Sequence, residues 1–98
     1  MRVIAKKTLV NYYTNNKDAE TALEEWHEKT TLAEWDNFTH VRQTFNSADY
    51  VGNKRVVFNI KGNKYRLVAL VLFKMKMVYI RFVGTHAEYD QIRDIEHI

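Results

Sequence analysis

The chain of 98 residues has no cysteine, no proline, only three glycines and no long run of apolar residues. The lack of cysteine excludes disulfides and cysteine-ligated zinc sites. Because neither a signal-peptide core nor a membrane-spanning stretch is visible, we expect a cytoplasmic protein without membrane attachment. The scarcity of glycine and proline argues against a flexible linker, so residues 1–98 are predicted to form one domain.

Positive charge is concentrated in one part of the chain. The net charge is only +3, yet residues 51–84 contain eight Lys and Arg and no acidic residue. The first 50 residues contain six basic and eight acidic residues. A segment with cations and no anions favours a polyanionic partner, with nucleic acid as the first choice. An ordinary basic surface is the alternative interpretation.

The first half of the chain has the apolar spacing of helices. Residues 3–13 are predicted to form a first helix, and Asn15 or Asn16 is placed to cap a second. A short third helix is predicted to begin at Thr39, followed by a loop over residues 46–49. The apolar face of the second helix recurs at steps of three and four residues: Ala19, Leu23, Trp26, Thr30 and Ala33.

The second half changes to the composition of strands, with many β-branched and aromatic residues. We predict three antiparallel strands, over residues 54–61, 64–73 and 78–84. The dipeptide Gly-Asn at residues 62–63 is a two-residue hairpin turn, and residues 75–76 are a weaker candidate for the second turn. The two halves together predict an α+β fold.

These turns fix the strand register and therefore the residues that share a face. Asn59 is predicted to pair with Arg66, and Leu70 with Arg81. A slip by one residue at the second turn would place Arg81 in the core, which is costly for a lone charge. The face suited to receive the helices carries Phe58, Ile60, Tyr65, Leu67, Ala69, Val71, Ile80 and Phe82. The opposite face carries Arg55, Val57, Asn59, Arg66, Val68, Leu70, Tyr79 and Arg81.

Two arginines of this second face are candidates for phosphate binding. Arg66 and Arg81 lie within apolar strands, and residues 51–84 offer no acid to pair with either. A guanidinium without an internal carboxylate is suited to a phosphate group. The alternative is that both are surface arginines on a solvated sheet face.

The stretch RFVGTHAEYD, residues 81–90, begins a helix directly after the last strand. Thr85 and Glu88 have the spacing of a capping box. His86 then lies in the first turn, with Tyr89 and Asp90 three and four positions later as neighbours. A histidine in this setting is a candidate general acid or base. The alternative is a purely structural helix start.

Motifs for a metal or a cofactor are missing. The other histidines, His27, His40 and His97, have no metal-ligand spacing. The chain also lacks a glycine-rich phosphate loop and a serine or cysteine nucleophile motif. We therefore expect no metal and no cofactor.

The stretch VVFNIKGNKYRLVALVLFKMKMVYIRFVGTHAEYD closely resembles the HigB family of toxins from bacterial type II toxin–antitoxin operons. The resemblance covers about residues 56–90 and rests on FNI-x-GNKYRL and VYIRFVGTHAEYD at the expected separation. The family usually has glycine where this chain has Lys61. The resemblance implies a RelE-like α+β domain, with N-terminal helices on one face of an antiparallel sheet of three or more strands and a short C-terminal helix.

The resemblance also implies a function. Such toxins are mRNA interferases that cut messenger RNA during translation on the ribosome, leaving a 2′,3′-cyclic phosphate without a metal. The partners would be a HigA-type helix-turn-helix antitoxin, the ribosome and messenger RNA, and the toxin alone is not expected to bind DNA. Two alternatives remain open: a non-enzymatic gyrase poison of the same fold, and an RNA-binding module without catalysis.

The motif positions of the family map onto Asn59, Asn63, Arg66, Arg81, His86, Tyr89 and Asp90. Arg66 and Arg81 are then expected to stabilise the phosphate, and His86 to transfer a proton. Tyr89 is the second candidate for proton transfer, or stacks on a base. The residues expected to bind RNA are Lys54, Arg55, Asn59, Lys61, Asn63, Lys64, Lys74 and Lys76.

Overall fold

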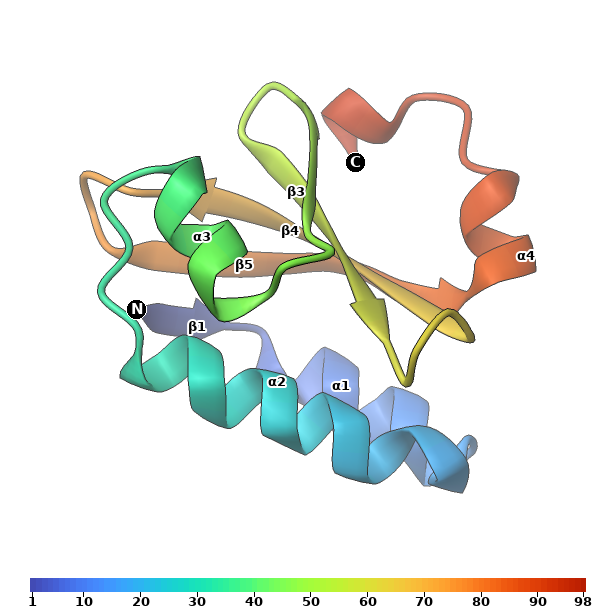
Figure 1. Cartoon of the computed structure of the whole chain (residues 1–98). Coiled ribbons are helices and arrows are strands. Elements are labelled where there is room, and N and C mark those ends of the chain that lie inside the picture. Colours follow the sequence, from blue (N-terminus) through green and yellow to red (C-terminus); the bar gives the residue numbers. More distant parts are fainter.

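A computed structural model describes residues 1–98 as an α+β fold, with the N-terminal helices packed on one face of a five-stranded sheet (Figure 1). The strands lie in the order β1-β5-β4-β3-β2, and only β1 is parallel to its neighbour. They are β1 (Arg2–Ile4), β2 (Asp49–Gly52), β3 (Arg55–Ile60), β4 (Tyr65–Leu72) and β5 (Met77–Thr85). The helices are α1 (Lys6–Thr14), α2 (Glu20–Leu32), α3 (Phe38–Thr44) and α4 (His86–Asp90). Two 3-10 turns complete the chain: η1 (Lys17–Ala19) and η2 (Ile95–His97).

The N-terminus differs from the sequence prediction. Residues 3–13 were expected to form one helix, but Arg2–Ile4 form the edge strand β1, parallel to β5. Ala5 adopts a left-handed conformation with φ of 76°, which separates this strand from α1. A strand of three residues is too short to show alternation in a sequence, and its apolar residues were therefore assigned to the helix.

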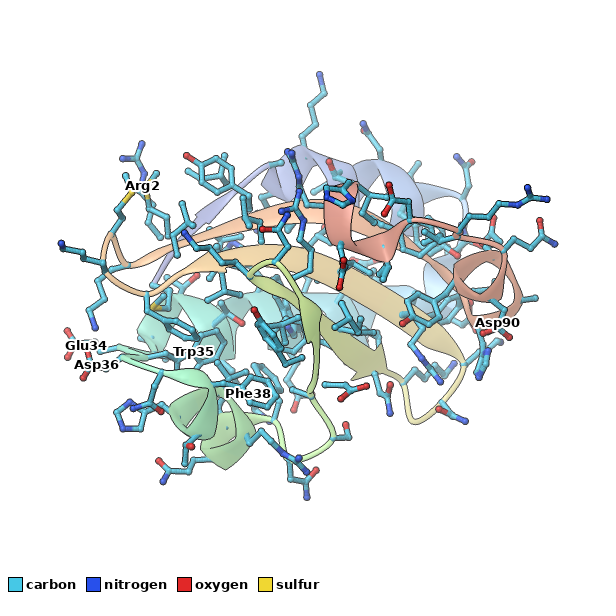
Figure 2. All side chains as sticks on the ribbon, turned by 90° about the horizontal axis from the view of Figure 1, so that it is seen from above. Arg2, Glu34, Trp35, Asp36, Phe38 and Asp90 are labelled. Atoms are coloured by element: carbon cyan, nitrogen blue, oxygen red, sulfur yellow. The ribbon has the colours of Figure 1, made fainter.

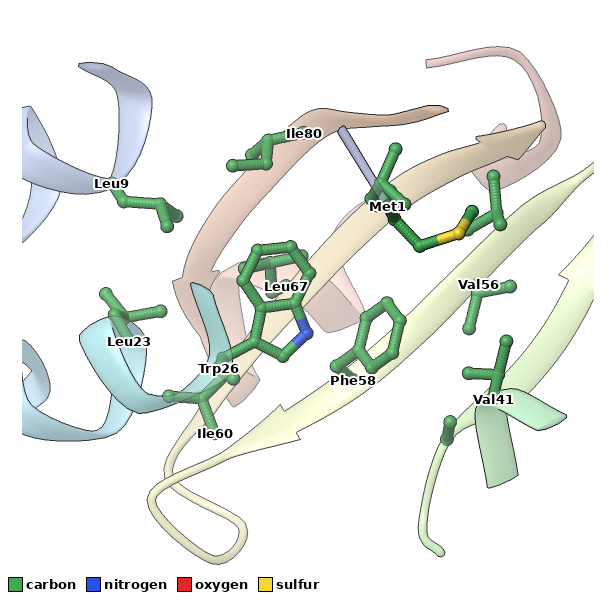
Figure 3. Close-up of a cluster of buried hydrophobic side chains, with 14 of the residues drawn as sticks. Met1, Leu9, Leu23, Trp26, Val41, Val56, Phe58, Ile60, Leu67 and Ile80 are labelled. Carbon is green, nitrogen blue, oxygen red and sulfur yellow. The ribbon is translucent and has the colours of Figure 1, made fainter. Parts of the chain in front are cut away.

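Helix α2 buries the face that its spacing predicted. Leu23, Trp26 and Thr30 are its buried residues. The indole ring of Trp26 meets the ring of Phe58 from β3 edge to face, with centroids 5.4 Å apart (Figure 3). Such an aromatic pair adds directional packing to the burial of apolar area. The core therefore lies between α2 and the sheet, as expected.

The ends of the helices are set by other residues than predicted. Asn16 does not cap α2; its side-chain amide donates to the main-chain oxygen of Tyr12 at the end of α1, 2.9 Å away. Helix α3 begins at Phe38 rather than Thr39. The side chain of Asn37 caps it by accepting from the main-chain N–H of His40 at 3.0 Å.

The register of β3 and β4 agrees with the prediction. Asn59 pairs with Arg66, and Phe58 pairs with Leu67 on the core side. The connection is longer than the predicted two-residue turn, because pairing stops at Ile60 and residues 61–64 form the loop. Lys61 and Lys64, which were predicted to pair, lie in this loop instead. Because the loop is longer by one residue at each end, the pairing of the other residues is unchanged.

The register of β4 and β5 was predicted incorrectly. Leu70 pairs with Tyr79, not with Arg81, and the pairing shifts by one residue between Val68 and Ala69. The shift is a bulge that leaves Arg81 as the extra residue of β5. Beyond it Phe82 pairs with Val68, so Phe82 leaves the predicted core face. On the side of the second turn the pairing differs from the prediction by two residues, which leaves the faces unchanged. The bulge then shifts the pairing by one residue, while Arg81 stays exposed.

The sheet face opposite α1 and α2 is covered in part by the C-terminal region. Helix α4 contacts β4 and β5, and η2 contacts β2. Val57 and Val68 are buried on this face, and Arg55 and Arg66 are nearly so. The face predicted to carry the arginines therefore has a buried apolar centre, and the C-terminal region covers part of it. None of the helices has the length and apolar character needed to span a bilayer.

Candidate functional site

A hollow of about 380 Å³ lies where β3 and β4 meet α4. It brings together four of the residues singled out from the sequence: Asn59, Arg66, His86 and Tyr89. Its remaining lining comes from the end of α3 and the start of β2: Arg42, Ser47, Ala48, Asp49 and, from β3, Val57. Residues far apart in the chain thus converge on one open depression of the surface.

Arg66 is held at the base of this hollow with only 8% of its surface exposed. Its Nη2 donates to the side-chain oxygen of Asn63 at 2.7 Å, and its Nη1 donates to the main-chain oxygens of Asn63 and Tyr65. None of these acceptors is a carboxylate. The guanidinium therefore has no ion-pair partner within the chain, which suits it to an anionic ligand.

The predicted capping box at the start of α4 is confirmed. The main-chain N–H of Glu88 donates to the Thr85 hydroxyl at 3.1 Å, and that of Thr85 donates to the Glu88 carboxylate at 2.8 Å. Gly84, just before it, pairs with Arg66, and a Cβ here would lie 2.6 Å from the Phe82 ring. A larger residue would therefore disturb the strand end that positions α4.

His86 is fixed from both sides. Its main-chain N–H donates to the carbonyl of Lys64 at 3.1 Å, tying α4 to the β3–β4 loop. Its ring atom Nδ1 lies 2.8 Å from the Oδ2 atom of Asp90. Because a carboxylate can only accept a hydrogen bond, Nδ1 carries the proton of this contact. The other ring nitrogen, Nε2, takes no part in the contact.

Tyr89 is half-buried beside Arg66 and Asp49. Burial, and next the negative charge of Asp49, raise the pKa of its phenol, while the charge of Arg66 works in the opposite direction. The phenol therefore stays protonated at neutral pH and can donate a hydrogen bond or a proton.

Sequence reasoning missed the part of the wall that comes from residues 42–49. Asp49 was assigned to a loop, but it begins β2 and pairs with Val57. A signal was present, because Gly52-Asn53 repeats the Gly-Asn dipeptide of residues 62–63 directly before a strand. Read as a second hairpin turn, it would have predicted a strand beside β3 and placed Asp49 opposite Val56, one residue from its observed partner Val57.

The lysines expected to bind RNA do not form one group. Lys61 and Lys64 both pair with Asp18, which also accepts from the hydroxyl of Tyr65 at 2.6 Å. Lys76 pairs with Asp36. Figure 2 shows Asp36 and Asp90 at opposite ends of the molecule, so Lys76 lies far from α4.

Four further predicted residues lie outside the hollow: Lys54, Arg55, Lys74 and Arg81. Lys54 and Lys74 line a separate, mainly apolar depression with Phe73 and Met75. Arg81 does not line the hollow with Arg66. Instead its Nε donates to the main-chain oxygen of Ile98 at 3.2 Å. No set of three or more His, Asp or Glu side chains converges as metal ligands would.

Comparison with known proteins agrees with the family expected from the sequence. Residues 19–92 match the HigB toxin family, the RelE-like toxic component of a toxin–antitoxin system. The chain belongs to this family. The matched region contains every residue that lines the hollow.

Individual HigB relatives match over a shorter stretch. The mRNA interferase toxin HigB of Escherichia coli strain K12 is 53% identical over 38 residues, which are 39% of this chain and 36% of that protein. The proteins named mRNA interferase HigB from Escherichia coli O157:H7 and Shigella flexneri match with the same identity and the same coverage. The matched stretch thus spans little more than a third of the length of these curated relatives.

Proposed function

We propose that the chain is the toxin of a type II toxin–antitoxin pair and an endoribonuclease that cleaves translated messenger RNA in the hollow between β3, β4 and α4. The observation that carries the proposal is the combination in this hollow of an unpaired buried arginine, a carboxylate-held histidine and a protonated tyrosine. The relatives named mRNA interferases support the same assignment.

The proposed reaction is attack by a ribose 2′-hydroxyl on the adjacent phosphate. The bond from phosphorus to the 2′-oxygen forms, and the bond from phosphorus to the 5′-oxygen of the next nucleotide breaks. The products are a 2′,3′-cyclic phosphate and a 5′-hydroxyl. This requires a base at the 2′-hydroxyl, an acid at the leaving 5′-oxygen and positive charge around the phosphorus.

His86 is assigned as the base of this reaction. The contact of its Nδ1 with Asp90 leaves Nε2 as the nitrogen that accepts the 2′-hydroxyl proton. The same carboxylate stabilises the imidazolium that forms after the transfer. Asp90 is therefore a positioning residue that acts through His86.

Tyr89 is assigned as the acid, because its phenol keeps a proton that can pass to the 5′-oxygen. Arg66 is assigned to the phosphate oxygens, whose negative charge increases in the transition state. Its hydrogen bonds to Asn63 hold the guanidinium in place before the substrate arrives. Asn59, opposite Arg66 in the sheet, is placed to bond a base or the ribose.

The partners follow from the same proposal. The toxin acts on messenger RNA at the ribosome in the cytoplasm and is neutralised by a HigA-type helix-turn-helix antitoxin. Six basic residues outside the hollow are assigned to phosphate groups of messenger or ribosomal RNA: Lys54, Arg55, Lys61, Lys64, Lys74 and Lys76.

The proposal is tested by inducing the chain in bacteria and mapping 5′ ends by primer extension on a translated message. A copy of the message without its start codon is the control. New ends within codons of the translated copy alone are expected, and Arg66→Ala should remove them. Intact messages together with DNA damage would instead indicate a gyrase poison and contradict the nuclease.

A further inference from the structure

Arg55 and Arg81 form a pair of arginines on the sheet face that carries the hollow, but outside the hollow itself. Arg55 of β3 donates through Nη2 to the main-chain oxygen of Ile98 at 2.7 Å, and Arg81 donates through Nε to the same oxygen at 3.2 Å. Two guanidinium groups from different strands therefore converge on one acceptor. Arg81 is the extra residue of the bulge in β5.

The pair has unused capacity for an anion. The only other acceptor of Arg55 is the main-chain oxygen of Asn53, and its buried Nε has no hydrogen-bond partner. Neither arginine is paired with an aspartate or glutamate side chain. A nearly buried arginine with an unsatisfied donor is costly unless a ligand completes it.

The segment that covers this pair is held by few contacts. None of the side chains of η2 is buried. Besides the Ile98 oxygen, the segment is held where Asn53 donates to the main-chain oxygen of Glu96 at 2.9 Å. Gly52 lets it lie close, because a Cβ there would be 2.2 Å from the Glu96 carboxylate. Figure 1 shows the C-terminal end beside the β2–β3 turn, on the side of the sheet away from α1 and α2.

The position relative to the hollow suggests the ligand. Arg55 and Asn59 are four residues apart in β3 and lie on the same face, which places them roughly 13 Å apart along the strand. Val57, between them, is apolar and lines the hollow. One extended nucleic acid strand can therefore place one phosphate at Arg66 and another at Arg55 and Arg81.

We propose that Arg55 and Arg81 form a second phosphate-binding site for the backbone of single-stranded RNA, and that residues 95–98 occupy this site until RNA displaces them. The Ile98 oxygen takes the place of a phosphate oxygen, accepting from both guanidinium groups. This inference rests on the proposed RNA substrate and adds to it a segment of the chain that competes with that substrate.

The test measures binding rather than cleavage, so its outcome is separate from that of the nuclease proposal. The probe is a short fluorescein-labelled 2′-O-methyl RNA, which has no 2′-hydroxyl to react, and fluorescence anisotropy reports its binding. We compare the full chain with a chain that ends at Asp94. The shortened chain is expected to bind about ten-fold more tightly, with a steeper salt dependence, by about 0.7 in log–log slope for each added phosphate contact.

Two variants make the result specific. Arg81→Ala in the shortened chain should abolish the gain, since Arg81 is exposed and its loss does not disturb the core. Asn53→Gly in the full chain removes the hydrogen bond to Glu96 while allowing the positive φ of 48° at this position, and should give part of the gain. If the shortened chain does not fold, the RNA affinity of Asn53→Gly compared with that of the unchanged full chain is the test.

Equal affinity and equal salt slope for the full and released chains would overturn the second site. A gain that persists in Arg81→Ala would overturn it as well, because binding would then not use this pair. If messages are cut in cells but release of the segment changes nothing, only the second site is wrong. If release strengthens binding but no message is cut, only the nuclease proposal is wrong.

Discussion

Nδ1 of His86 lies 2.8 Å from Oδ2 of Asp90, one turn later in α4. Because α4 has only five residues, this contact and the capping box at Thr85 are what define its geometry. The ring of the proposed base is therefore oriented by Asp90 of its own helix, while the guanidinium of Arg66 is oriented by Asn63 of the β3–β4 loop. The two functional groups can be tested separately.

Asp90→Ala is expected to lower kcat for RNA cleavage by about ten-fold or more with little change in KM, because Asp90 orients His86 and does not touch the substrate. Asp90→Asn should keep part of the activity, since its side-chain oxygen still accepts from Nδ1 but carries no charge. Single-turnover rates with wild type, both variants and His86→Ala check this order. An equal loss in Asn and Ala variants, accompanied by a rise in KM, would contradict the orienting role.

Arg66→Ala is expected to lower cleavage by about 10²–10³-fold, the usual cost of losing one preorganised donor at a developing negative charge. Arg66→Lys should restore little, because an ammonium cannot bond Asn63 and two phosphate oxygens in the plane of a guanidinium. Lys7→Ala, at an exposed position of α1 and outside the residues expected to bind RNA, is the control and should keep wild-type activity. Full activity of Arg66→Lys would show that only charge is needed there.

Trp26→Ala is expected to lower the free energy of unfolding by about 3–5 kcal/mol, because it empties the contact between α2 and Phe58. Leu32→Ala, in the same helix but 76% exposed, should change it by less than about 0.5 kcal/mol. Urea denaturation monitored by far-UV circular dichroism measures both. Similar losses in the two variants would mean that α2 is not packed as described.

Asp18 gives a pH dependence of stability. Hydrogen bonds from Lys64 and then Tyr65, with help from Lys61, lower the pKa of this carboxyl in the folded chain. The unfolded chain, with a carboxyl pKa of about 3.9, therefore binds the proton first as pH falls. The stabilisation by Asp18 is fully present at neutral pH and is lost as pH drops below about 4.

The measurement is the free energy of unfolding of wild type and Asp18→Asn between neutral pH and pH of about 2. Wild type should be the more stable at neutral pH, and the difference should shrink in acid, since the asparagine cannot titrate. A difference that stays constant across this range would show that the cluster of Asp18, Lys61 and Lys64 does not contribute through charge.

Much of the sheet could be predicted from sequence because its signals are local. The Gly62-Asn63 turn fixed the pairing of Asn59 with Arg66, and the spacing of Thr85 and Glu88 fixed the capping box. Both depend on residues within a few positions of each other. These local signals predicted two sides of the hollow from the sequence alone: the paired strands β3 and β4, and the start of α4.

The features that were not predicted from the sequence depend on contacts between residues far apart in the chain. The bulge at Arg81 has no signature in β5 itself, and it moved Phe82 to the other face. The partner of Lys61 and Lys64 is Asp18, more than forty positions earlier in the chain. Arg81 was expected to join Arg66, but the fold of residues 95–98 over β3 and β5 gives it another partner. Such pairings follow from tertiary packing, which a local pattern does not contain.

The chemistry of the cut RNA ends tests the central claim most directly. RNA from cells that express the chain, or its His86→Ala or Arg66→Ala variant, is ligated to an adapter with and without prior treatment by polynucleotide kinase. Attack by the 2′-hydroxyl predicts 5′-hydroxyl ends that ligate only after kinase treatment, matched by upstream 2′,3′-cyclic phosphates and strongly reduced in both variants. Ends that carry a 5′-phosphate, or cuts that persist unchanged in both variants, would contradict the proposed site.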